Sequence, residues 1–171
     1  MIADQVQTRV APTVHTQVIP DRTMLRAQLE ATRTAFHKLL DATSGARWQA
    51  KSPTSSWTFG EVLVHLTFAL EYLPEEVASA RRGKGMFNMP KWIADPASYW
   101  LIRWQARKGD PETLRRRYDA AMDATVAALD TVPDSDWGLG APFYGHGLYT
   151  VADLFATPIQ HLTEHTERWE L

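Results

Sequence analysis

Four long segments of this chain repeat apolar residues at intervals of three and four, and this pattern constrains the fold more than any other feature. Such intervals place side chains on one face of an α-helix, whereas a half-buried strand buries every second residue. Alternation of that kind is absent after the first twenty residues. Amphipathic helices bury their apolar stripes by packing against one another. The pattern therefore predicts an all-α four-helix bundle around one core.

Capping signals mark where these helices begin. Thr58 and Glu61 have the spacing of a capping box, in which the hydroxyl and the carboxylate each accept from a backbone amide. Asp110 followed by Pro111 is typical of a cap and a first helical residue, and Thr150 precedes another apolar-periodic segment. The helices are expected over residues 21–43, 58–82, 110–131 and 151–169.

Two segments lie outside this helical pattern. Residues 1–20 contain Pro12 and Pro20 and are expected to form an extended arm, so that residues 21–171 make up the domain. Residues 83–109 break the periodicity between the second and third helices and form a long aromatic-rich insertion. Its rings either cover one end of the core or an interface, or they form the wall of a pocket. They are Phe87, Trp92, Tyr99, Trp100 and Trp104.

Composition excludes several classes of function. With 171 residues, 44% of them hydrophobic, the chain is expected to fold as one domain. Its net charge of -2 provides no positive field that would attract nucleic acid or anionic membranes. It has no cysteine, which excludes disulfides, thiolate metal sites and a cysteine nucleophile. No stretch resembles a signal peptide or approaches about 18 apolar residues, so a cytoplasmic location is the expectation.

The histidines carry the main chemical signal. His161 and His165 lie four residues apart on the apolar face of the last helix, which places their Cβ atoms about 5–6 Å apart. His65 lies in the apolar stripe of the second helix. Three histidines on core-facing stripes either bind one metal ion together or are separately hydrogen-bonded core residues. Spacing alone leaves both interpretations open, because a motif match of this kind arises often by chance.

The arrangement resembles a known family. A histidine in "SWTFGEVLVHLTFA", a variable middle and the H-x-x-x-H of "YTVADLFATPIQHLTEHTERW" are similar to the DinB-like (YfiT/DinB) superfamily of four-helix bundles, over residues 21–169. The resemblance implies that His65, His161 and His165 bind a divalent metal inside the bundle, commonly zinc, nickel or iron. It also implies a homodimer. The arm and the aromatic insertion depart from the family pattern.

The resemblance further implies an enzyme that acts on a small-molecule substrate. Relatives include transferases and isomerases that use a low-molecular-weight thiol, and others described as metal-dependent hydrolases. Three neutral histidines leave the charge of the ion uncompensated and favour an anionic fourth ligand, such as hydroxide or a thiolate. Since the chain has no cysteine, any thiol comes from outside.

Two further residues are candidates for proton transfer. Glu61 lies one helical turn before His65 and could orient a ligand or accept a proton, although its capping position explains it equally well. His146 lies in the glycine-rich connection before the last helix and could overhang the pocket. The alternative to an enzyme is a non-catalytic dimeric bundle with core histidines or a structural metal.

Overall fold

The computed structural model describes residues 19–85, 91–108, 110–143 and 147–170, and for residues 91–98 and 108 it describes the backbone alone. Most of the expected arm, residues 1–18, therefore lies outside the described residues, as does His146.

The four predicted helices are present, and their caps are those expected from the sequence. Thr58 and Glu61 form the predicted capping box, and Asp110 caps a helix that begins at Pro111. Thr150 forms a second capping box with Asp153. The helices are α1, Arg22–Thr43; α2, Phe59–Ala80; α4, Pro111–Asp130; and α5, Val151–Thr166.

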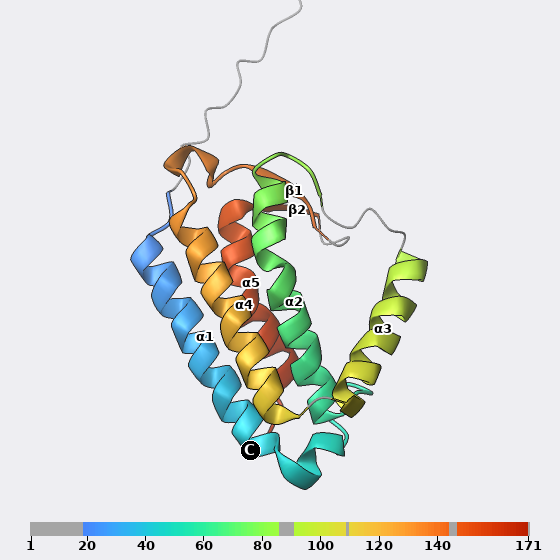
Figure 1. Ribbon diagram of the computed structural model, residues 1–171. Coiled ribbons are helices and arrows are strands. Elements are labelled where there is room, and N and C mark those ends of the chain that lie inside the picture. The colour runs from blue at the N-terminus through green and yellow to red at the C-terminus, as the bar shows by residue number, and fades with distance from the viewer. Residues whose placement is uncertain (1–18, 86–90, 109, 144–146, 171) are drawn as a thin grey trace, which may run out of the picture.

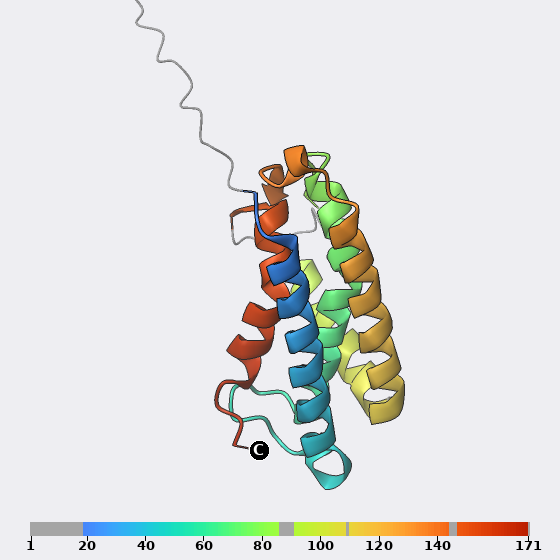
Figure 2. The ribbon, with the colours of Figure 1, turned by 90° about the vertical axis from the view of Figure 1, so that its left-hand side faces the viewer.

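The four helices pack in a square (Figures 1 and 2). α2 packs against α4 and α5, and α1 packs against the same two helices, so α1 and α2 occupy one diagonal. Figure 1 shows that α2 and α4 run in the same direction, opposite to α1 and α5. Because α2 and α4 are parallel neighbours, the chain between them must return along the full length of the bundle.

A fifth helix, α3 (Lys91–Lys108), makes this return and occupies most of the segment predicted as a long aromatic-rich insertion. The apolar pattern of the sequence did not predict this helix. Among the described side chains of α3, at residues 99–107, Ile102 and Ala106 are buried while Trp100 and Trp104 are exposed. Over this part of the helix the buried stripe is narrow and lacks the wide apolar face by which amphipathic helices are recognised. Figure 1 shows that the C-terminal end of α3 lies beside α2.

A two-stranded antiparallel hairpin closes the end of the bundle between α4 and α5. It consists of β1 (Gly140–Pro142) and β2 (Leu148–Thr150), with Ala141 opposite Tyr149. Strands of three residues are too short to show an alternating pattern, which explains why the sequence does not predict them.

The core consists of side chains from all four bundle helices. Phe36 of α1 stacks on Tyr118 of α4, with ring centroids 3.6 Å apart, and both residues are buried. None of the helices in the described parts of the chain combines the length and apolar composition needed to cross a membrane.

Candidate metal centre

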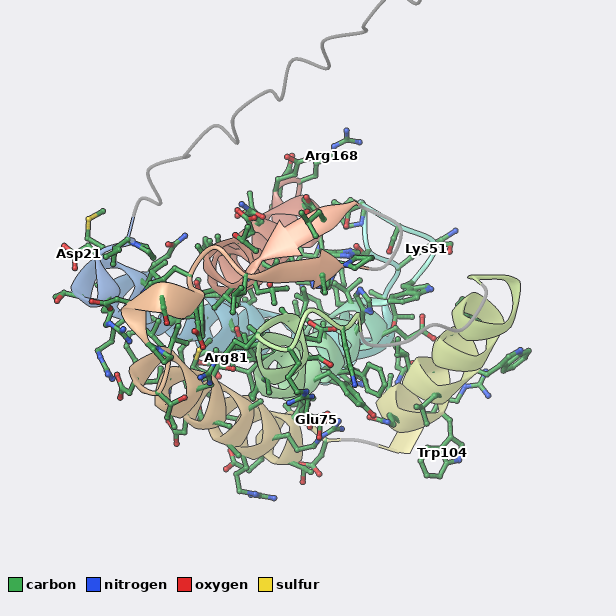
Figure 3. The ribbon with its side chains drawn as sticks, turned by 90° about the horizontal axis from the view of Figure 1, so that it is seen from above. Asp21, Lys51, Glu75, Arg81, Trp104 and Arg168 are labelled. Carbon is green, nitrogen blue, oxygen red and sulfur yellow. The ribbon has the colours of Figure 1, made fainter. Side chains whose placement is uncertain are left out.

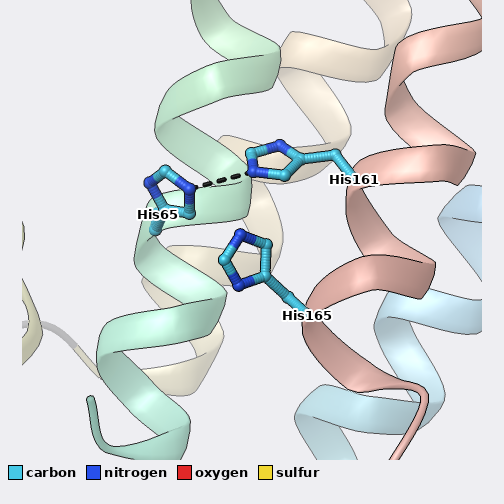
Figure 4. A group of neighbouring side chains, drawn as sticks. All are labelled: His65, His161 and His165. Carbon is cyan, nitrogen blue, oxygen red and sulfur yellow. Dashed lines mark hydrogen bonds between the residues drawn. The ribbon is translucent and has the colours of Figure 1, made fainter. Parts of the chain in front are cut away.

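The structure brings the three predicted histidines together. α2 places His65 in its second turn, and α5 places His161 and His165 one turn apart on the side that faces α2. Figure 4 shows the three rings pointing toward one another across the space between the two helices. Helix packing therefore joins residues that lie about a hundred positions apart in the sequence.

The distances among the rings fit a common ligand. Nε2 of His65 lies 2.9 Å from Nε2 of His161, the contact drawn in Figure 4. The ring centroid of His165 lies 5.0 Å from that of His65 and 4.8 Å from that of His161. One nitrogen from each ring lies within 4.8 Å of the others, so the group could hold a metal ion.

Two observations test whether a metal fits this group. Nitrogens bound at about 2.0–2.1 Å to one tetrahedral ion lie about 3.3 Å from one another, which is near the 2.9 Å between His65 and His161 and below the 4.8 Å that bounds the whole group. Within the described structure, Nδ1 of His65 is buried without a hydrogen-bond partner, so no hydrogen bond from a described residue holds this ring in place through that atom. An ion shared with His161 and His165 would fix the ring from its Nε2 side.

The burial of the rings sets their charge. Burial, together with the neighbouring His161 and His165, lowers the pKa of His65 from 6.5 to about 3. Burial also lowers the pKa of His165, although the charge of Glu164 acts in the opposite direction. Both rings are therefore neutral near pH 7, which is the state in which an imidazole nitrogen can donate its lone pair to a metal.

The segment before α2 holds both helices of the site in place. Trp57 packs edge-on against His65, with centroids 4.9 Å apart, and forms part of the surrounding wall. The hydroxyl of Thr54 donates to the backbone carbonyl of His165 over 2.6 Å. At the end of α5, Nε1 of Trp169 donates to Oγ of Ser52 over 3.2 Å. This segment therefore sets the separation of the two histidine-bearing helices.

Glu61 lies one turn from His65, as predicted, and both of its oxygens are hydrogen-bonded. Oε2 accepts from the amide of Thr58 over 2.9 Å, and Oε1 accepts from Nε of Arg103 over 2.9 Å. Arg103 also donates to the hydroxyl of Tyr99, so the carboxylate ties α3 to the start of α2. The role of Glu61 as a proton acceptor stays a prediction.

A cavity of about 490 Å³ opens beside the three histidines, a size typical of sites for small organic molecules. Its wall is formed by α2 and α5, with additions from α3, α4 and the hairpin. Among the described side chains of α3, Ile102 reaches it. The exposed Trp100 and Trp104 are not part of the wall, and Phe87 and the side chain of Trp92 lie outside the described residues. The aromatic side chains of the described wall come from other segments and include Trp57 and Tyr149.

Trp57 and Glu76 are among the residues of this wall that were not identified from the sequence as parts of the site. Trp57 precedes the cap of α2, and Glu76 lies near the end of α2; Tyr149, which precedes the cap of α5, was considered only as a loop residue near the pocket. Helical spacing could have indicated Glu76, because eleven residues separate it from His65 and return to nearly the same helix face. No comparable signal marks Trp57 or Tyr149, whose positions depend on loop geometry.

The fold and the histidine group define the class of protein: a helical bundle in which two helices supply a candidate metal centre beside a cavity. A sequence profile of the DinB superfamily matches residues 28–168, a range that includes all three histidines. The chain belongs to the DinB superfamily, which confirms the resemblance seen in the sequence. Comparison with curated proteins and with solved structures gives no match.

Proposed function

We propose that this protein is a metal-dependent enzyme in which His65, His161 and His165 hold one divalent ion, such as zinc, nickel or iron. The observation that carries this proposal is the convergence of three ring nitrogens at the wall of a cavity large enough for a small-molecule substrate. A site with three protein ligands beside an open space is typical of catalytic rather than structural metal sites.

The chemistry follows from the charge of the ligands. Bound by three neutral rings, a divalent ion supplies Lewis acidity and stabilises an anionic oxygen or sulfur. The chain holds the rings with Trp57 and with the Thr54 bond to α5, and its cavity wall excludes bulk water from one side of the group.

Among the two chemistries expected from the family, small-thiol-dependent transfer or isomerisation is favoured over hydrolysis. Hydrolysis needs a carboxylate or imidazole free to accept a proton near the reacting atom. The nearby Glu61 already accepts from Thr58 and Arg103, whereas Glu164 is exposed at the rim of the cavity. A thiol bound as thiolate needs no such acceptor once it is deprotonated, and it must come from outside because the chain has no cysteine.

The competing proposal is a non-catalytic bundle with a structural metal or none. Metal content distinguishes these cases. We expect the purified, untagged protein, or chelator-treated protein titrated with zinc, nickel or iron(II), to bind about one ion per chain by elemental analysis. His65→Ala and the double variant His161→Ala, His165→Ala should lose it. His37→Ala is the matched control, because His37 pairs with Asp119 between α1 and α4.

Two results decide between the proposals. Uptake that survives the loss of all three rings, or no uptake by the unaltered protein, would overturn the metal centre. A bound ion that accepts none of the added ligands thiol, imidazole or azide would favour a structural metal, because a catalytic site keeps a position open to ligands.

Self-association is a further proposal from the family resemblance. α3 carries a patch formed by Trp100, Leu101 and Trp104, which are 63%, 39% and 56% exposed. Figure 3 shows Trp104 pointing away from the bundle. Apolar patches of this kind often mark protein interfaces. Light scattering should give the mass of a dimer for the unaltered protein and a monomer for Trp100→Gln, Leu101→Gln.

A further inference from the structure

A carboxyl group lies on the cavity wall far from the histidines. Glu76 and His65 belong to the same helix, and both line the cavity. Eleven residues at about 100° each bring Glu76 back to within about 20° of the face of His65, about 16 Å further along the axis of α2. The two residues therefore mark the two ends of one elongated cavity.

The surroundings of Glu76 are mainly apolar. Leu73 precedes it by one turn on the cavity wall, and Phe143 lines both the cavity and a small adjoining pocket that Glu76 also reaches. A cationic residue, Lys84, also lines that small pocket. Within the described parts of the chain, no ion pair or hydrogen bond involves the Glu76 carboxyl, Lys84 included. Burial alone raises the pKa of Glu76 from 4.5 to about 7.

The charges on the cavity wall have one sign. Its described lining includes Glu76 at one end and Glu164 at the rim beside the histidines, and no lysine or arginine. Away from the proposed ion, a lining with carboxylates and no cationic side chain favours a cationic group over an anionic one. A partly buried carboxyl group without a protein partner is a strong acceptor for a donor brought by a ligand.

We propose that Glu76 binds an ammonium group at the end of the substrate remote from the histidines, so that the cavity selects elongated molecules with an amine at one end and an apolar body. The description of this ligand as a substrate rests on the proposed function, whereas the amine site itself does not require a metal. Glu76 lies too far along α2 to touch a group reacting at the histidines, so it is a specificity residue rather than a catalytic one.

A matched pair of probes tests the site. Titration calorimetry at pH 8 compares n-octylamine with octanoate, which share an apolar chain and differ in the charge of the head group. The unaltered protein should bind the amine about tenfold or more tightly than the acid, the range expected for one charge-assisted hydrogen bond in a partly buried site. Glu76→Gln removes the charge with little change in shape and should abolish this preference.

Glu75→Gln is the matched control. Glu75 is the exposed neighbour of Glu76, labelled in Figure 3, and its substitution removes the same charge from the outer surface of α2. The preference for the amine should survive in Glu75→Gln. Thermal unfolding of each variant, followed by circular dichroism, verifies that the helices are intact.

Each outcome has a definite meaning. Equal binding of the two probes, a preference for octanoate, no binding of either, or a preference that persists in Glu76→Gln would each overturn the proposal. The titrations are repeated on chelator-treated protein, where the preference should remain; its loss there would mean that the amine binds the metal instead. If no metal binds at all, the proposed metal-dependent enzyme is ruled out, but the titrations still test the amine site. If metal binds and the protein shows no preference for the amine, only the inference about Glu76 is overturned.

Discussion

Arg103 donates from Nε to Oε1 of Glu61 over 2.9 Å, and this ion pair joins α3 to the first turn of the helix that carries His65. The Glu61 side chain is 7% exposed and that of Arg103 33% exposed, so the pair is shielded on the carboxylate side. The same carboxylate completes the capping box with Thr58. One side chain therefore fixes both the start of α2 and the position of α3.

Arg103→Ala should destabilise the fold by about 1–3 kcal/mol, because it leaves a buried carboxylate without its charged donor. Urea unfolding followed by circular dichroism gives this value. Arg116→Ala is the control, since Arg116 and its partner Glu112 are both exposed and such pairs contribute little. An equal, small effect of both substitutions would show that the Glu61 pair does not hold α3 in place.

Metal removal should lower the melting temperature. A ligand that binds the folded state alone stabilises it by about 2.7 kcal/mol when present at one hundred times its dissociation constant. Chelator treatment should therefore lower the melting temperature by several degrees, and zinc should restore it. His161→Ala should show no response to either treatment, whereas His37→Ala should respond like the unaltered protein. A response that persists in His161→Ala would place the stabilising ion elsewhere.

Glu76 should make stability depend on pH. Its pKa is raised from 4.5 to about 7, so between these values the folded chain binds the proton more tightly than the unfolded chain. The free energy of unfolding should then fall as pH rises through this range, by about 3 kcal/mol in total. Glu76→Gln should remove this loss and be the more stable form at pH 8, with little difference at pH 4. Glu75→Gln, tested alongside by urea unfolding, should follow the unaltered protein.

Gly60→Ala should destabilise the start of α2. A Cβ at this position would lie 2.3 Å from Cε2 of Trp48, a buried indole whose Nε1 donates to the carbonyl of Ala106 in α3. Overpacking of this kind costs about 1–3 kcal/mol. In a Trp48→Leu background the indole atoms are gone, so the added cost of Gly60→Ala should largely disappear in a double-mutant cycle. An undiminished cost would place the clash elsewhere.

The helices of the bundle were predictable because their signals are local. A capping box joins residues three apart, as at Thr58 and Thr150, and an apolar stripe repeats within one helix. α3 was missed because its described side chains bury only a narrow stripe, which includes Ile102 and Ala106, and because its sequence contains Pro96, a residue that normally interrupts a helix. The hairpin was missed because each strand has only three residues.

The candidate site was predictable in part for the same reason. His161 and His165 share a face by helical spacing, which the sequence shows directly. That His65 joins them was an expectation from its stripe and from the family resemblance. The state of Glu61 was not predictable, because its second partner, Arg103, is 42 residues away.

By itself, then, the sequence determined the all-α class, the helix starts and the pair of histidines on α5, since each depends on residues within a few turns of one another. Only the tertiary structure decided that α2 and α4 run in parallel, that α3 forms the return connection from one to the other, and that His65 contacts His161. It also decided that Glu76 lies on the same cavity wall as the histidines, without an ion pair or hydrogen bond to a described residue. These features depend on which helices pack together, and that choice is made by the whole core rather than by any short segment.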